Sequence, residues 1–196
     1  MTQEILKILR NLPQIKTSRL TLRKIEMRDA QDLFRCLSDE RVTGAMMHRR
    51  MTIIDEMNEK IEEYMEEYEM CAGARWCVET ELQRVIGSVL LYRVNNATRA
   101  VIGFYLNPEF WGCGYASEMV AAVINFGFTR LRLNRIECDC FIENRSSARV
   151  MERVGMSFEG ESRDYYLVNN VQRSVARYAI LKRDWEVMKR DAKTKT

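Results

Sequence analysis

The order of strand-like and helix-like segments predicts one α/β domain built around a mixed sheet. The chain has 196 residues, of which 46% are hydrophobic and 30% charged, so it can bury a full core. Apolar runs with strand character alternate with amphipathic segments of helical period. One pair of neighbouring strands is joined by a short turn and a later pair through a helix, so both antiparallel and parallel pairing are expected.

The first half of the chain predicts helices and strands in alternation. Helices are expected at 2–12, after Asp29, and at 53–70, where Thr52 with Asp55 resembles a weak capping box. Strands are expected at 18–25, 75–79, 84–94 and 100–106. Asn95 and Asn96 separate the last two strands and favour a hairpin.

The second half continues with a strand, helix and strand unit. A helix at 116–133 lies between the strands at 100–106 and 135–142, which predicts that these two strands are parallel. A short helix at 146–154 should stop at Gly155, and Asn169 with Asn170 should turn a hairpin between 156–168 and 172–181. We expect residues 1–196 to form a single domain, with a helical extension at 1–16 and a tail at 186–196.

Composition excludes several classes of function. A formal net charge of +3, spread evenly, is too small to indicate DNA or RNA as the main partner. No apolar run is long enough to cross a membrane and the first residues do not resemble a signal peptide, so a cytoplasmic protein is expected. The six cysteines form no regular framework and are expected to be reduced. Cys138 and Cys140 would share one face of a strand, but they lack a second ligand pair with zinc spacing, so no metal is expected.

The segment "NPEFWGCGYASE", residues 107–118, lies between a strand end and a helix start. The first N–H groups of a helix have no partner within it and its dipole is positive there, so such a turn can hold an anion such as a phosphate. Gly112 and Gly114 permit backbone angles that other residues avoid. A tight turn without a ligand is the alternative for two glycines alone. A P-loop lysine and the third glycine of a dinucleotide fingerprint are both missing.

Three segments together resemble a known family, namely "IGFYLNPEFWGCGYASEMV", "LNRIECDCFIENRSSARVMERVGMSFEG" and "YAILKRDW". They are similar, in the same order, to the GNAT acyltransferase superfamily and, within it, to the ribosomal-protein N-acetyltransferase (Rim-type) branch. The resemblance runs from Ser18 to Trp185. It implies a twisted, mostly antiparallel sheet of about seven strands with a central, splayed parallel pair and helices on both faces.

The resemblance also implies acetyl-CoA as cosubstrate. Its pyrophosphate would lie on the N–H groups of the glycine turn and the first helical residues, and its pantetheine arm would run beside the strand before the turn like an added strand. The N–H of Leu106 would polarise the thioester carbonyl as an oxyanion donor. The residues expected to bind the cosubstrate here are Phe104, Tyr105, Leu106, Trp111, Gly112, Cys113, Gly114, Tyr115, Ala116 and Ser117.

The segment "ENRSSARV" supplies the second half of the expected site. By resemblance, Asn144 bonds the pantetheine and Ser147 lies near the sulfur, where its hydroxyl protonates the departing thiolate. Helix capping alone would also explain an Asn and a Ser at this place. Arg149, one turn later, is expected to contact CoA phosphates. Met151 stands where many relatives carry a tyrosine acid.

One departure from the family concerns the general base. Many relatives carry a glutamate where this chain has Val101. An α-amine of pKa about 8 is roughly one tenth neutral at pH 7, whereas a lysine amine near 10.4 is neutral in under one part in a thousand. The acceptor is therefore expected to be an α-amine, such as the N-terminus of a ribosomal protein, with direct attack in a ternary complex. Tyr166 or a carboxylate of the acidic helix would relay the proton.

Two other functions stay open at the level of sequence. A small-molecule acetyltransferase would act on a polyamine, an aminoglycoside or an amino acid. A non-catalytic CoA-binding module would regulate a partner. The helix at 53–70, with eight carboxylates between Asp55 and Glu69, would attract a cationic acceptor or simply face solvent. A homodimer is a further expectation.

Overall fold

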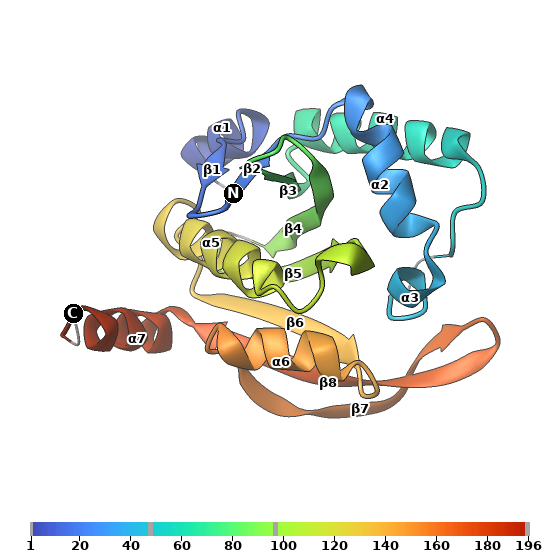
Figure 1. Cartoon of the computed structure of the whole chain (residues 1–196). Coiled ribbons are helices and arrows are strands. Elements are labelled where there is room, and N and C mark those ends of the chain that lie inside the picture. The colour runs from blue at the N-terminus through green and yellow to red at the C-terminus, as the bar shows by residue number, and fades with distance from the viewer. Residues whose placement is uncertain (1, 47–48, 96–97, 195–196) are drawn as a thin grey trace.

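The computed structural model describes residues 2–46, 49–95 and 98–194. Within them the chain forms one eight-stranded sheet flanked by helices (Figure 1). The strands are β1 (Ile15–Lys16), β2 (Leu20–Arg23), β3 (Gly73–Thr80), β4 (Val85–Asn95), β5 (Arg99–Leu106), β6 (Arg135–Phe141), β7 (Ser157–Val168) and β8 (Val171–Leu181). The helices are α1 (Gln3–Arg10), α2 (Ala30–Leu37), α3 (Glu40–Thr43), α4 (Ile54–Glu69), α5 (Tyr115–Thr129), α6 (Arg145–Arg153) and α7 (Lys182–Thr194), with 3-10 turns η1 (Met27–Asp29) and η2 (Pro108–Phe110).

The sheet has the strand order β1-β2-β3-β4-β5-β6-β8-β7. Its β5–β6 pair is parallel and the other neighbouring strands of the described chain are antiparallel, which confirms the mixed, mostly antiparallel sheet. The eighth strand, beyond the seven or so expected, is the two-residue β1, which pairs with Thr21 and Leu22 of β2. A segment this short carries no alternating pattern from which sequence could predict it.

The central parallel pair opens along its length. The register of β5 with β6 runs from Arg99 opposite Arg135 to Val101 opposite Glu137. Strand β5 continues to Leu106, which is still paired with Gly87 of β4 on its other side. The second half of β5 therefore has β4 on one side and a gap in the pairing toward β6 on the other. Below, this opening between residues 102–106 and β6 is called the splay.

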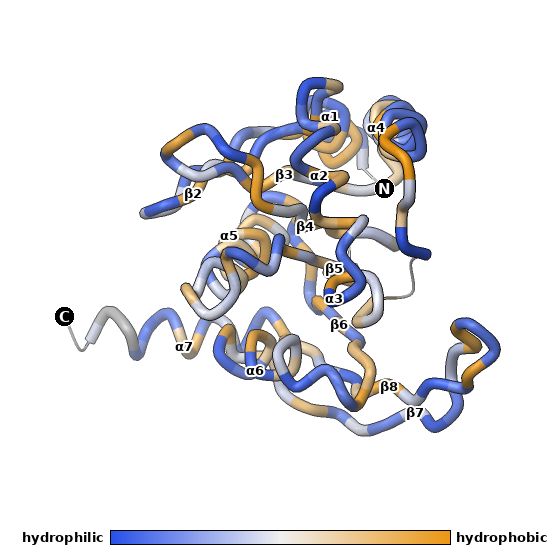
Figure 2. The backbone as a smooth tube through the Cα atoms, turned by 45° about the vertical axis from the view of Figure 1, so that its right-hand side comes forward, coloured by the Kyte–Doolittle hydropathy of each residue, from blue (hydrophilic) through white to orange (hydrophobic). Residues whose placement is uncertain are grey.

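Two hydrophobic cores cover the two faces of the sheet. Helix α5 buries Met119, Val120 and Val123 in one core together with Ala100 and Ile102 of β5. The opposite face carries α2 and α4, whose Leu33, Met57 and Ile61 share a second core with Tyr105. Figure 2 shows the hydrophobic colour concentrated in the middle of the molecule, along the central strands and the turns of α5 that face them. Side chains alternate between the two faces of a strand, so the even-numbered Ala100 and Ile102 of β5 enter the first core and the odd-numbered Tyr105 enters the second.

Several predicted boundaries shift for local reasons. Helix α4 begins after Ile53, and its first turn is closed by Glu56, whose carboxylate accepts the N–H groups of Thr52 and Ile53, so the predicted Thr52–Asp55 box is wrong. Helix α6 ends before Gly155, as predicted, because φ is +86° there.

Both ends of the described chain are helical. Helix α1, within the helix expected at 2–12, packs Ile5 and Leu9 into the core of the α5 face. Helix α7 runs to Thr194, and Trp185 packs against Phe128 with ring centroids 5.3 Å apart. Both ends are held because their apolar side chains find core partners.

The two predicted hairpins are present. Strands β4 and β5 pair antiparallel with Asn95 opposite Arg99, and Asn96 lies outside the described residues. Asn169 and Asn170 have φ of +50° and +60°, the pattern of a type I′ turn, between β7 and β8. Over the described ranges, no helix is long and apolar enough to span a bilayer.

Candidate active site

The glycine turn has a left-handed backbone at two positions. Gly112 has φ +79° and Gly114 has φ +82°, values that cost most other residues free energy. Gly114 is the N-cap of α5, and the N–H of Glu118 makes the first helical bond to its carbonyl at 3.1 Å. The N–H groups of Tyr115, Ala116 and Ser117 precede that bond and point out of the helix end. The turn therefore presents backbone donors to an anion, at the positive end of the helix dipole.

Trp111 connects this turn to the sheet. Its indole N–H donates to the carbonyl of Leu106 at 2.9 Å, and the side chain is 46% exposed. Trp111, which precedes the two glycines, thus holds the last peptide of β5 in place. Between Leu106 and Trp111, the 3-10 turn η2 is capped by Asn107, whose side-chain oxygen accepts the N–H of Glu109 at 3.0 Å.

The backbone of β5 alternates between β4 and the splay. The N–H of Asn107 donates to the carbonyl of Ile86 at 2.8 Å, on the β4 side. In an antiparallel ladder the hydrogen-bonding residues alternate, so Tyr105 also turns its N–H and C=O toward β4. Phe104 and Leu106 turn theirs toward β6, where the β5–β6 register has ended at Val101. Of the three predicted β5 residues, Phe104 and Leu106 therefore present peptide groups to the splay, and Tyr105 serves the core.

The second wall of the splay is formed by β6 and the start of α6. Asn144 is the N-cap of α6, and its side-chain oxygen accepts the N–H of Ser147 at 3.1 Å. Its amide nitrogen also approaches the carbonyl of Ala45 at 3.4 Å. The capping role weighed from sequence is thus present. Ser147 lies in the first turn of α6, Arg149 is exposed on the same helix, and Met151 is buried.

A polar cavity of about 240 Å³ lies where β5 and β6 separate. Val101 and Glu137, which are opposite each other in the parallel register, both line it. The rest of the lining comes from β4, the start of β5, β6 and the β7–β8 hairpin, namely Tyr92, Arg99, Asp139, Tyr165, Tyr166 and Arg177. The structure therefore brings Tyr166, a predicted proton relay, into the cavity that Val101 lines.

The carboxylates of this cavity face arginines. Glu137 accepts from Nε of Arg135 at 2.6 Å and lies 3.7 Å from Arg99. Asp139 stands opposite Arg177 in the β6–β8 register. The formal charges of the lining residues thus balance, and Glu137 in particular is already committed to two guanidinium groups.

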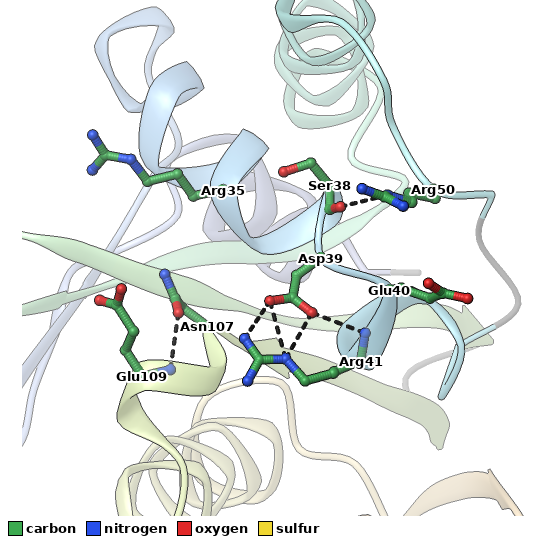
Figure 3. A pocket seen from close by; sticks show the side chains of 8 residues that line it. All are labelled: Arg35, Ser38, Asp39, Glu40, Arg41, Arg50, Asn107 and Glu109. Carbon is green, nitrogen blue, oxygen red and sulfur yellow. Dashed lines mark hydrogen bonds and ion pairs between the residues drawn. The ribbon is translucent and has the colours of Figure 1, made fainter.

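A second, wider depression of about 480 Å³ lies between α2, α3 and η2 (Figure 3). Its arginines are engaged within the protein: Arg41 pairs with Asp39, and Arg50 donates to the carbonyl of Ser38 at 2.7 Å. Asn107 and Glu109 form its lower rim in Figure 3, so the depression borders the loop that follows β5. His48, beside these arginines in the sequence, lies outside the described residues.

Sequence reasoning missed Arg19, which lies against the glycine turn. Its Nη1 donates to the carbonyl of Cys113 at 3.0 Å, and its guanidinium lies 4.4 Å from the centroid of the Tyr115 ring. Glu118 of α5 holds it with an Nη2–Oε2 distance of 2.7 Å. The sequence contains no pattern that links residues about one hundred positions apart, so only the fold could reveal this contact.

Comparison with known proteins agrees with this geometry. The family model described as acetyltransferase (GNAT) domain matches residues 19–157. The chain is 32% identical over 172 residues to YoaA of Bacillus subtilis, named an uncharacterized N-acetyltransferase, covering 87% of this chain and 97% of that protein. It is 26% identical over 165 residues to the spermidine N(1)-acetyltransferase of Vibrio cholerae, covering 84% and 94%. A GNAT-family acetyltransferase structure from Bacillus anthracis superposes with a TM-score of 0.80 at 28% identity, covering 87% of this chain and 99% of that one.

The chain belongs to the GNAT acetyltransferase family, since the family model covers more than half of it. The resemblance seen in the sequence is confirmed, and with it the expectation of an enzyme rather than a binding module. The protein is an N-acetyltransferase that takes its acetyl group from acetyl-CoA and transfers it to an amine.

Proposed function

We propose that this enzyme acetylates an α-amine, with a protein N-terminus such as that of a ribosomal protein as the favoured acceptor. The diphosphate of acetyl-CoA binds the N–H groups of residues 112–117, and the pantetheine runs along Phe104 and Leu106 in the splay. The amine attacks the thioester carbonyl directly. The N–H of Leu106 donates to the developing oxyanion.

The remaining proton transfers complete the proposed reaction. Collapse of the tetrahedral intermediate breaks the C–S bond and releases the CoA thiolate, which takes a proton from a nearby water, either directly or through the Ser147 hydroxyl, which regains its own proton from that water. The attacking nitrogen loses one proton to water, relayed by Tyr166. Asn144 positions the pantetheine, and Arg149 contacts a phosphate.

The state of Glu137 is the observation that favours an α-amine. This carboxylate lies opposite Val101, closest in register to the place of the missing glutamate, yet it is bound by Arg135 and approached by Arg99. A general base takes a proton through a hydrogen bond, and the two guanidinium groups already occupy Oε1 of Glu137. An acceptor that is already partly neutral in solution needs no strong general base to deprotonate it. At neutral pH, α-amines of pKa about 8 meet this condition, whereas amines of pKa near 10.4 do not.

The pH dependence of kcat/KM with two acceptors tests this proposal. The acceptors would be peptides whose reacting amines differ in pKa by about 2 units. With no strong protein base, the rising limb should follow each acceptor, because the rate depends on the fraction of neutral amine. The variant Val101→Glu should raise activity toward the high-pKa amine more than toward the α-amine.

A limb that stays near pH 6 to 7 for both acceptors, unchanged in Val101→Glu, would contradict the proposal and point to a protein base. Val101→Gln is the matched control, since it adds a similar volume without a basic group. Release of CoA thiol, measured over a panel of N-terminal peptides and free amines, would identify the acceptor class directly.

A small polyamine is the second candidate acceptor. It is favoured by the likeness to a protein named spermidine N(1)-acetyltransferase. The balanced charges of the cavity at Val101 argue against it, because a polycation gains most from a site with excess negative charge. Faster turnover of spermidine than of any N-terminal peptide would decide for this alternative.

A further inference from the structure

The segment before β2 is clamped onto the first turn of α5. One oxygen of the Glu118 carboxylate accepts the hydroxyls of Thr17 and Ser18 at 2.7 and 2.9 Å, and the N–H of Arg19 at 3.0 Å. Its other oxygen accepts Nε of Arg19 at 2.8 Å. Because both the backbone and the side chain of Arg19 are held, the guanidinium has a fixed place beside the glycine turn.

Arg19 fixes one peptide of the turn. It donates to the carbonyl of Cys113 at 3.0 Å, and Nη2 would lie 3.5 Å from a Cβ placed on Gly114. In a trans peptide the C=O and the following N–H point in opposite directions, so the N–H of Gly114 is turned away from Arg19. Rotating this peptide changes ψ of Cys113 and φ of Gly114, and glycine accepts either sign of φ at little cost. Without Arg19, the turn could therefore present a carbonyl oxygen where an anion needs an N–H.

We infer that Arg19 is a positioning residue for the cosubstrate diphosphate, and that Glu118 holds it in place. It acts by selecting the orientation of the Cys113–Gly114 peptide in the free enzyme, so that the anion meets a turn that is already arranged. This role rests on the proposed binding of the diphosphate at the turn. It adds a contribution to cosubstrate binding from the N-terminal segment, which lies outside the glycine turn.

Calorimetric binding of CoA to the parent and to three variants tests the inference. Arg19→Gln should raise Kd about tenfold, equivalent to about 1.4 kcal/mol. Arg19→Lys should raise it nearly as much although it keeps the charge, because an ammonium lacks the planar fork that reaches Glu118 and Cys113 together. Arg28→Gln is the matched control, since Arg28 also pairs with a glutamate, Glu26, at an exposed site, and it should bind CoA like the parent.

Steady-state kinetics separates positioning from a general loss of structure. With saturating acetyl-CoA, kcat and the KM of the acceptor should stay within about twofold of the parent in both Arg19 variants, because only cosubstrate binding is affected. Normal CoA binding by Arg19→Lys would overturn the inference and leave a role for charge alone. A loss of kcat equal to the loss of affinity would also overturn it. A parent enzyme that does not bind CoA would instead contradict the proposed function.

Discussion

Substitution of Gly114 by aspartate should leave the fold intact and weaken CoA binding. The position has φ +82°, where asparagine and aspartate are tolerated better than other side chains. A Cβ there would approach Nη2 of Arg19 to 3.5 Å, an ordinary contact distance. The strain of an L-residue in this conformation is about 1 to 2 kcal/mol at most. For a chain of this size we expect Tm to fall by no more than about 8 °C.

The effect on binding comes from charge. A carboxylate about 4 Å from one phosphate charge costs about 1 kcal/mol in bulk water and about 4 kcal/mol at an effective dielectric constant of 20. The turn is partly exposed, and Arg19 is close enough to pair with the new carboxylate, so we expect about 2 kcal/mol. This corresponds to about a thirtyfold rise in the Kd of CoA.

Gly114→Asn is the matched control, because asparagine has nearly the same shape and the same tolerance of positive φ without the charge. Calorimetry should therefore find that Gly114→Asp binds CoA with a much higher Kd than Gly114→Asn. The difference between the two Kd values should decrease as added salt screens the charges. Equal Kd values for the two folded variants would refute the assignment of an anion site to this turn.

Three further predictions concern stability. CoA at one hundred times its Kd should stabilise the native state by about 2.7 kcal/mol and raise Tm by about 5 to 10 °C, and no shift would count against binding. Burial alone would raise the pKa of Glu118, but hydrogen bonds from Thr17, Arg19 and Ser18 lower it. Its folded pKa is thus below its unfolded pKa, so its contribution is present at neutral pH and lost as pH falls below about 4.5. In urea unfolding, the stability gap between the parent and Glu118→Gln should therefore be wide at pH 7 and shrink toward pH 3. Trp111→Phe keeps an aromatic side chain but loses the indole N–H that donates to Leu106, so the free energy of unfolding should fall by about 1 kcal/mol, and an unchanged value would show that this bond contributes nothing.

The elements that sequence predicted well carry strong local signals. The glycines at 112 and 114 and the paired asparagines at 169 and 170 occupy left-handed backbone positions, a preference of the residue itself. The period of α5 and the strand, helix and strand order around it were sufficient to predict the parallel pairing of β5 and β6.

The cap of α4 shows where a local signal misled. Thr52 and Asp55 have the residue types and the spacing of a capping box, yet the neighbouring Glu56 makes the bonds. The helix begins at Ile54, one residue later than predicted, and Glu56 then stands at its third position, from which its carboxylate reaches back to the N–H groups of Thr52 and Ile53. A one-residue shift of the helix start thus changes which acidic residue closes the first turn.

Sequence by itself determined the class of fold, the left-handed glycine turn and the family, because these depend on residue preferences and short spacings along the chain. The tertiary structure alone decided that Arg19 reaches Cys113 and that Tyr166 shares a cavity with Val101. Each of these contacts joins residues that are far apart in the sequence, and no sequence pattern relates the two positions. They exist because strands far apart in sequence become neighbours in the sheet, and their geometry follows from the register that the two cores impose.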